Sequence, residues 1–151
     1  MVDGIDRSIL RYLKEDGRMT ATALAGKVGL TVAPCHRRLR DLETSGVIRG
    51  YRADIDPAAV GLGFEAIVFV TLRQVDRAIL AAFEARVAAM LNVVEAQRLF
   101  GAPDYLLKVI AADLPAYQRF YDDELAALPG VERLTSTLVM KNLKSNTGPP
   151  V

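Results

Sequence analysis

The spacing of apolar residues changes part-way along the chain, and this change limits the fold more than any other feature. Up to about residue 53, apolar side chains recur every three or four residues, as in helices with one buried face. From residue 64 onward, alternating segments typical of strands are interspersed with two further helical patterns. Residues 54–63 contain Asp56-Pro57 and two glycines, a composition typical of a connection between domains. We therefore expect two small domains within the 151 residues.

The first part of the chain predicts three helices, over residues 3–15, 20–28 and 32–44. Asp3, Thr20 and Thr31 each stand where an N-cap side chain would accept a backbone N–H. Gly29 separates the second helix from the third, and glycine allows the left-handed backbone of a tight turn. Residues 47–52 predict a short strand or wing. Together these elements predict a winged helix-turn-helix domain over residues 1–53.

The third predicted helix has one narrow apolar seam, formed by Cys35, Leu39 and Leu42. Five of the ten lysines and arginines in residues 1–55 fall between Arg37 and Arg52. A rigid helix with an exposed N-terminal half fits the DNA major groove, and nearby cations can hold phosphates. The residues that we expect to contact double-stranded DNA are Thr31, Val32, Ala33, His36, Arg37, Arg40, Arg49 and Arg52.

The second part predicts the order strand, helix, strand, strand, helix, strand. The strands are expected over residues 64–72, 93–100, 105–111 and 131–141, and the helices over 78–91 and 114–128. This βαββαβ order predicts a ferredoxin-like sheet with both helices on one face. The fold class is therefore α+β, with residues 64–141 as the second domain and 142–151 as a mobile tail.

The first predicted strand is apolar on both of its faces. Ala66, Val68 and Val70 share one face, while Ile67 and Phe69 point to the other. A sheet covered by helices on one side only is expected to be polar on its open side. We therefore expect the open face to pack against another subunit.

Motifs in both parts of the chain resemble the Lrp/AsnC family, also called the leucine-responsive or feast/famine regulators. In the first part the matching residues are Ile5-Asp6-Arg7-Ser8-Ile9-Leu10, Gly17-Arg18, Leu24-Ala25, Val28-Gly29-Leu30-Thr31, Pro34-Cys35, Arg38-Leu39, Leu42-Glu43 and Gly46-Val47-Ile48-Arg49-Gly50-Tyr51. In the second part they are Gly101-Ala102-Pro103-Asp104-Tyr105-Leu106-Leu107-Lys108, Leu128-Pro129-Gly130-Val131 and Val139-Met140.

The resemblance implies a DNA-binding transcriptional regulator whose second domain senses a small effector, an amino acid. It also implies homodimers built by packing two sheets face to face, assembly into octamers, and effectors bound near contacts between dimers. The residues that match the family's effector site are Gly101, Ala102, Pro103, Asp104, Tyr105 and Ser136. On this basis Gly101 lets backbone approach the ligand, Asp104 pairs with an α-ammonium group, and Ser136 donates to the α-carboxylate.

Some of these residues also have plain structural interpretations. For Arg38 we favour an ion pair with Asp6 or Glu43 over contact with a base. Asp104 lies in a turn with glycine and proline, where an aspartate often bonds to its own backbone. Tyr105 and Ser136 lie on predicted strands and would then only pack.

The sequence offers little for catalysis or for a bound metal or cofactor. The only histidine, His36, follows the only cysteine, Cys35, and adjacent helical residues point about 100° apart, so they cannot form a catalytic pair. With one of each, neither a disulfide nor a Cys- or His-based metal site is expected. We expect no enzyme activity, although a small ferredoxin-like enzyme and an amino-acid-sensing module without DNA binding are the alternatives.

The same sequence indicates where the protein is expected to work. No stretch approaches the roughly 18 apolar residues that cross a bilayer. The first ten residues also lack the basic-then-apolar order of a signal peptide. We therefore expect a cytoplasmic protein without a membrane partner.

Overall fold

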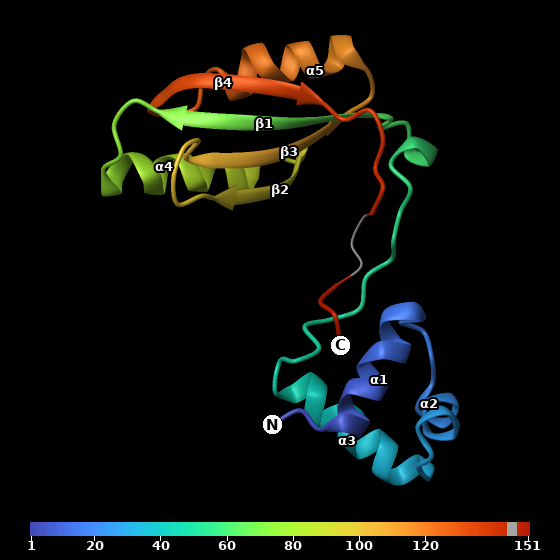
Figure 1. Ribbon diagram of the computed structural model, residues 1–151. Coiled ribbons are helices and arrows are strands. Elements are labelled where there is room, and N and C mark those ends of the chain that lie inside the picture. Colours follow the sequence, from blue (N-terminus) through green and yellow to red (C-terminus); the bar gives the residue numbers. More distant parts are fainter. Residues whose placement is uncertain (145–147) are drawn as a thin grey trace. The chain divides into compact units, whose positions relative to one another are not determined.

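A computed structural model describes residues 1–144 and 148–151 and contains two compact units (Figure 1). Unit 1 comprises residues 1–54 and the described residues of 143–151, and unit 2 comprises residues 55–142. Three residues of the predicted tail, 145–147, lie outside the described residues. Within unit 1, Lys14 Nζ donates a hydrogen bond of 2.7 Å to the carbonyl oxygen of Pro149.

Unit 1 contains the three predicted helices, α1 (Gly4–Glu15), α2 (Ala21–Val28) and α3 (Val32–Thr44). Asp3 caps α1 by accepting from the N–H of Asp6, and Thr20 caps α2 by accepting from the N–H of Ala23. Thr31 occupies the N-cap of α3, but its side chain makes no capping bond, so that part of the prediction was wrong. The helices enclose a core formed by Ile9, Leu24, Ala25, Cys35 and Leu42.

The segment that follows α3 is a wing without a strand. Residues 47–52 form no ladder, because the described part of unit 1 contains no strand with which they could pair. The Ile48 N–H bonds instead to the Leu42 carbonyl at 3.0 Å, which holds the start of the wing against the end of α3. A short 3₁₀ turn, Ala58–Val60, interrupts the connection predicted over residues 54–63.

Unit 2 contains one antiparallel sheet in the order β2-β3-β1-β4. The strands are β1 (Phe64–Leu72), β2 (Val93–Arg98), β3 (Tyr105–Ala111) and β4 (Val131–Leu138). Helix α4 (Arg77–Ala89) follows β1, and α5 (Leu114–Phe120) follows β3 (Figure 1). Side chains of α4, α5 and the sheet share a single core, which places both helices on the same face of the sheet. The predicted α+β architecture is confirmed.

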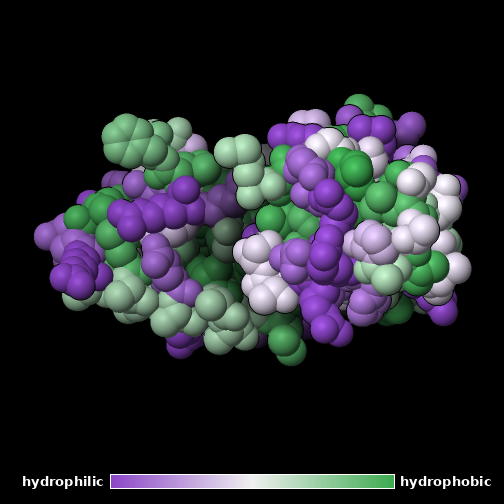
Figure 2. Space-filling model, turned by 90° about the horizontal axis from the view of Figure 1, so that it is seen from below, coloured by the Kyte–Doolittle hydropathy of each residue, from purple (hydrophilic) through white to green (hydrophobic). Residues whose placement is uncertain are grey.

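Alternation along β1 and β3 separates the two faces of this sheet. Ala66, Val68 and Val70 are fully buried beneath the helices, while Ile67 and Phe69 on the open face are half-buried. Apolar side chains also reach the surface elsewhere, as the green areas of Figure 2 show on one side of the molecule.

Four predicted elements of unit 2 end earlier in the structure, and the first of them, α4, ends at Ala89 rather than at residue 91. The regular part of α5 ends at Phe120 and continues as a wider π turn over Tyr121–Leu125, which brings Phe120 and Leu125, five residues apart, into the same core. β2 ends at Arg98, and the Leu99 N–H bonds to the Asp104 carbonyl at the start of the following turn. β4 ends at Leu138, and Met140 is fully exposed.

Candidate DNA-binding surface and effector loop

The orientation of α3 in unit 1 is fixed by its buried seam. Gly29 adopts a left-handed backbone (φ 70°) at the end of α2, which allows the sharp turn into α3. Cys35 and Leu42 are buried and Leu39 is half-buried, as the sequence pattern predicts. Burial raises the pKa of the Cys35 thiol, which keeps it protonated and unreactive. The opposite side of α3 therefore faces outward.

Every residue proposed from the sequence for DNA contact is exposed. Val32 keeps 46% of its surface exposed at the start of α3. The others are likewise exposed in unit 1, on α3, at its N-cap or on the wing: Thr31, Ala33, His36, Arg37, Arg40, Arg49 and Arg52. Small side chains at the N-terminal end and cations on the following turns give a surface that can approach a groove closely.

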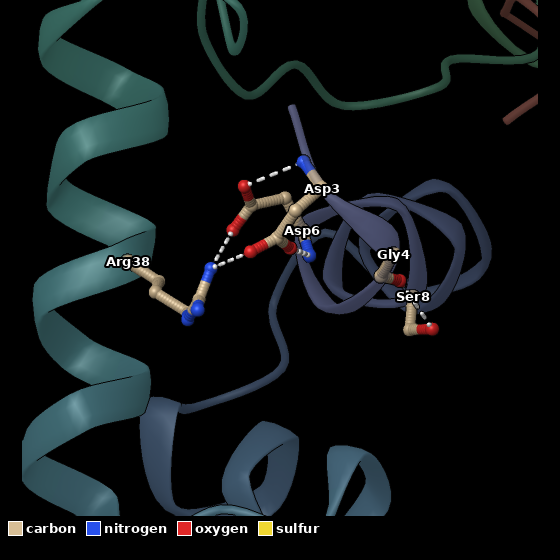
Figure 3. Close-up of polar contacts among 5 residues, drawn as sticks. All are labelled: Asp3, Gly4, Asp6, Ser8 and Arg38. Carbon is tan, nitrogen blue, oxygen red and sulfur yellow. Dashed lines mark hydrogen bonds and ion pairs between the residues drawn. The ribbon is translucent and has the colours of Figure 1, made fainter. Parts of the chain in front are cut away.

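Arg38 belongs to a different environment from its neighbour Arg37. Its guanidinium Nη1 lies 2.7 Å from Asp3 Oδ2 and 2.8 Å from Asp6 Oδ1, so it joins α3 to the start of α1 (Figure 3). The other oxygens of the two carboxylates complete a capping box, in which each accepts the other residue's N–H. The predicted ion pair with Asp6 is thus present, and the arginine is held inside the domain rather than directed at DNA.

These bonds change the ionisation of the cluster. The pKa of the Asp3 carboxyl lies below its ordinary value, first because it accepts from the Asp6 N–H and then because Arg38 donates to it. Hydrogen bonds to Asp6 and Asp3 also raise the pKa of the Arg38 guanidinium. Asp3 and Arg38 therefore stay charged near neutral pH.

Glu43, the other proposed partner of Arg38, bonds instead to Tyr51 in the wing. The Tyr51 hydroxyl donates to Glu43 Oε1 at 2.8 Å. Its ring lies beside Gly17, where an added Cβ would meet it at 3.6 Å. Burial and then the bond to Glu43 raise the pKa of Tyr51 to about 12. Tyr51 therefore fixes the wing between Arg49 and Arg52, a role that its place in the matching motif alone does not show.

The predicted effector loop lies between β2 and β3. Gly101 has φ 139°, a conformation that side chains disfavour. Asp104 Oδ2 accepts a 2.7 Å bond from the N–H of Leu72 at the end of β1, while Oδ1 has no partner in the described part of the chain. The carboxylate thus anchors the loop to the sheet, not to its own turn, and keeps one oxygen available.

The other two predicted effector residues have their own partners within the chain. The buried Tyr105 donates its hydroxyl to Glu84 Oε1 of α4 at 2.7 Å. Burial and this bond raise the pKa of Tyr105 to about 12. Ser136 lies on β4 opposite Val68, and its hydroxyl bonds to the Tyr117 hydroxyl of α5. Since β1 separates β3 from β4, a single chain does not bring Ser136 together with residues 101–105.

Similarity to known proteins identifies the family. A family model described as "Lrp/AsnC ligand binding domain" matches residues 65–149, and one described as "Winged helix-turn-helix DNA-binding" matches residues 2–49. The chain belongs to the Lrp/AsnC family. It is accordingly a DNA-binding transcriptional regulator with an effector-binding domain, and the family predicted from the sequence motifs is confirmed.

Individual relatives resemble this family member over nearly their whole length. The leucine-responsive regulatory protein of Rhizobium meliloti is 41% identical over 95% of this chain and 92% of its own. The Bkd operon transcriptional regulator of Pseudomonas aeruginosa is 37% identical over 99% and 98%. A transcriptional regulator of Neisseria meningitidis, solved as a complex with L-methionine, superposes with a TM-score of 0.94 at 35% identity, covering 99% of this chain and 97% of its own.

This Lrp/AsnC chain shows neither a metal site nor a membrane-spanning helix in the part that the structure describes. Among those residues, no three His, Cys, Asp or Glu side chains come together as a metal site would require. Of the helices in residues 1–144 and 148–151, none is long and apolar enough to span a bilayer.

The open face of the sheet carries a second group of residues, apart from the effector loop. Phe69 lies beside Leu106 in the β1–β3 ladder, and Ile67 lies beside Lys108. Lys108 Nζ pairs with Glu65 Oε1 at 3.1 Å, and these two side chains are only 20% and 15% exposed. The face thus has an apolar centre and a paired charge, in agreement with the two-sided pattern of β1.

Proposed function

We propose that this regulator binds double-stranded DNA with α3 and the wing. The supporting observation is the contrast between the two arginines. Arg38 is neutralised within unit 1, while Arg37 and Arg40 remain exposed on the outer face of α3. Val32 and Ala33 are small enough to approach base edges, and the N-terminus of α3 attracts a phosphate. Arg49 and Arg52 hold phosphates beside the wing.

The salt dependence of DNA affinity tests this surface. Full-length protein is titrated by fluorescence anisotropy against the DNA upstream of its own gene, over a series of KCl concentrations. The double variant Arg37→Ala/Arg40→Ala is expected to bind more weakly and to lose about 0.9 in the slope of log K against log salt for each phosphate contact removed. An unchanged affinity and slope would remove these residues from the interface.

A matched variant separates contact from net charge. Arg7 and Arg11 are exposed on α1 of the same unit. The variant Arg7→Ala/Arg11→Ala loses the same charge outside α3, so its slope is expected to stay close to that of the parent protein. An equal fall in both double variants would indicate non-specific attraction alone.

We infer that the effector is an amino acid bound at the loop of residues 101–105. The L-methionine complex of the Neisseria relative supports this class of ligand. Asp104 keeps Oδ1 available, and a carboxylate there suits an α-ammonium group. Because Ser136 is remote from the loop within one chain, its proposed bond to the α-carboxylate requires a second subunit.

The effector loop is tested by removing the negative charge of Asp104. Asp104→Asn keeps an oxygen that can accept from the Leu72 N–H but loses the negative charge. We expect unchanged DNA affinity without ligand and no shift of that affinity on adding L-methionine. A variant that still responds to L-methionine as the parent protein does would show that the loop assignment is wrong.

We further propose that the open sheet face forms a homodimer, and that dimers assemble into octamers. The apolar centre around Phe69 supports the dimer contact. In this proposal residues 1–53 bind DNA, residues 54–63 connect, residues 64–141 bind effector and oligomerise, and residues 142–151 form the tail.

A further inference from the structure

A groove of about 260 Å³ lies between α4 and the edge strand β2. We call it the α4–β2 groove. One part of its lining is apolar and comes from both elements: Phe83, Val87, Ala88 and Val93. The other part is polar and contains Glu84, Arg98 and Tyr105. A small site with apolar walls and a few converging polar groups is the usual form of a ligand pocket.

At the polar end of the groove, a carboxylate and a guanidinium form an exposed ion pair that is too long for a hydrogen bond. Arg98 Nη1 lies 3.8 Å from Glu84 Oε1, beyond the range of a good hydrogen bond. Glu84 Oε1 already accepts from the Tyr105 hydroxyl at 2.7 Å. In the described part of the chain, Glu84 Oε2 and the Arg98 guanidinium have no hydrogen-bond partner. Both side chains are about half exposed, so a ligand can reach them from solvent.

From this arrangement we propose that the α4–β2 groove is a second small-molecule site, and that it takes a zwitterion with an apolar side chain. The carboxylate of the ligand pairs with Arg98, whose planar guanidinium offers two parallel donors. Its ammonium group donates to Glu84 Oε2. Its side chain packs against Ala88, Val93 and Val94, whose surfaces in the groove are not already buried in the core, and this contact excludes water from them. Tyr105 acts as a positioning residue, because its hydroxyl holds the carboxylate of Glu84.

This site shares Tyr105 with the effector loop of residues 101–105 proposed above, but none of the other residues of that loop lines the groove. Ligand binding in the groove also does not require DNA binding, so the experiments on the DNA surface and on the groove can give opposite outcomes. A subunit with both sites would bind two amino acids.

Isothermal titration calorimetry on the full-length protein tests the proposal, with L-leucine as the probe. In the Asp104→Asn background, the groove is expected to retain one leucine per chain. Adding Arg98→Gln is expected to weaken that binding at least about tenfold, because the partner of the ligand's carboxylate is lost. Adding Arg86→Gln instead removes a cation of α4 that does not line the groove, and leucine affinity is expected to be unchanged.

A steric variant and two analogues complete the test. Ala88→Trp fills the groove from an exposed helix position, so it is expected to abolish leucine binding while circular dichroism stays unchanged. The oxo acid 4-methyl-2-oxopentanoate lacks the ammonium group and isopentylamine lacks the carboxylate, so each is expected to bind at least about tenfold more weakly than leucine. The proposal is overturned if Asp104→Asn protein binds no leucine, or if Arg98→Gln and Ala88→Trp leave its affinity unchanged.

Discussion

Arg37 and Arg38 are adjacent in the sequence, yet they have different physical roles. On a helix, neighbouring side chains point about 100° apart, so one turns outward and the other reaches α1. Arg38 donates one hydrogen bond to each carboxylate of Asp3 and Asp6. Each of these carboxylates also accepts from the backbone N–H of the other aspartate. Arg37 has no such partner in the described residues and is exposed. The surroundings of each arginine, not its residue type, decide whether it pairs within the domain or stays exposed to solvent.

The cluster at Asp3 predicts how stability depends on pH. A carboxyl whose pKa is lowered in the folded state stabilises the protein above the ordinary aspartate pKa of about 3.9, and this contribution is lost as pH falls through the folded pKa. In the variant Asp3→Asn, the amide oxygen would still cap α1, but the side chain would carry no charge. We therefore expect this variant to lower the urea midpoint of unit 1 at pH 7, and the difference from the parent protein to narrow below about pH 3.9. A difference that is the same at all pH values would contradict the charged pair.

Single elements of unit 2 combine regular and irregular geometry. The π turn after α5 accommodates two buried side chains five residues apart, which a continuous α-helix would place on different sides. The chain then turns at Gly130, with φ 74°, before it enters β4. A Cβ at this glycine would clash with Cγ2 of Ile79 on α4. Gly130 thus permits both the turn and the close approach of the helix.

Two glycine variants separate these effects. Gly61 also has positive φ, 80°, but nothing within 4 Å of an added Cβ. Gly61→Ala is expected to cost only the backbone strain, about 1–2 kcal/mol of unfolding free energy. Gly130→Ala is expected to cost about 1–3 kcal/mol more, the usual range for overpacking, because Ile79 must move. Urea denaturation of both variants measures the difference, and equal values would exclude the contact with Ile79.

At the scale of the whole molecule, the open sheet face distinguishes a monomer from an assembly. A lone sheet with one covered face is expected to be polar on the other. Here Phe69 and Leu106 lie side by side on the open face, next to an ion pair that is already largely sheltered. A second surface, as in the proposed homodimer, would remove the exposed part of the apolar pair from water.

A charge at the centre of this face is expected to separate the dimer. Phe69→Glu would place an unpaired carboxylate in the interface, so we expect the association constant from sedimentation equilibrium to fall at least about a hundredfold. Val75→Glu introduces the same negative charge at an exposed apolar position that follows β1. This control variant is expected to leave association unchanged. A Phe69→Glu protein that remains a dimer would contradict this interface.

The sequence alone determined the order of the elements and which face of each is buried, because these depend on local spacing. The helices α1 to α3 and the strands β1 and β3 could be predicted in this way, whereas for Arg38 the sequence left Asp6 and Glu43 as alternative partners. Local spacing did not predict the missing strand in the wing or the π turn, since strand pairing and core packing depend on distant partners.

Which candidate residues lie together depends on contacts between distant parts of the chain. Strand order places Ser136 beside Tyr117, away from the loop that contains Asp104. The same order places Glu84, Arg98 and Tyr105, from three separate elements, at the end of one groove. Residues far apart in a chain become neighbours through strand pairing and helix packing, and no local pattern records those contacts.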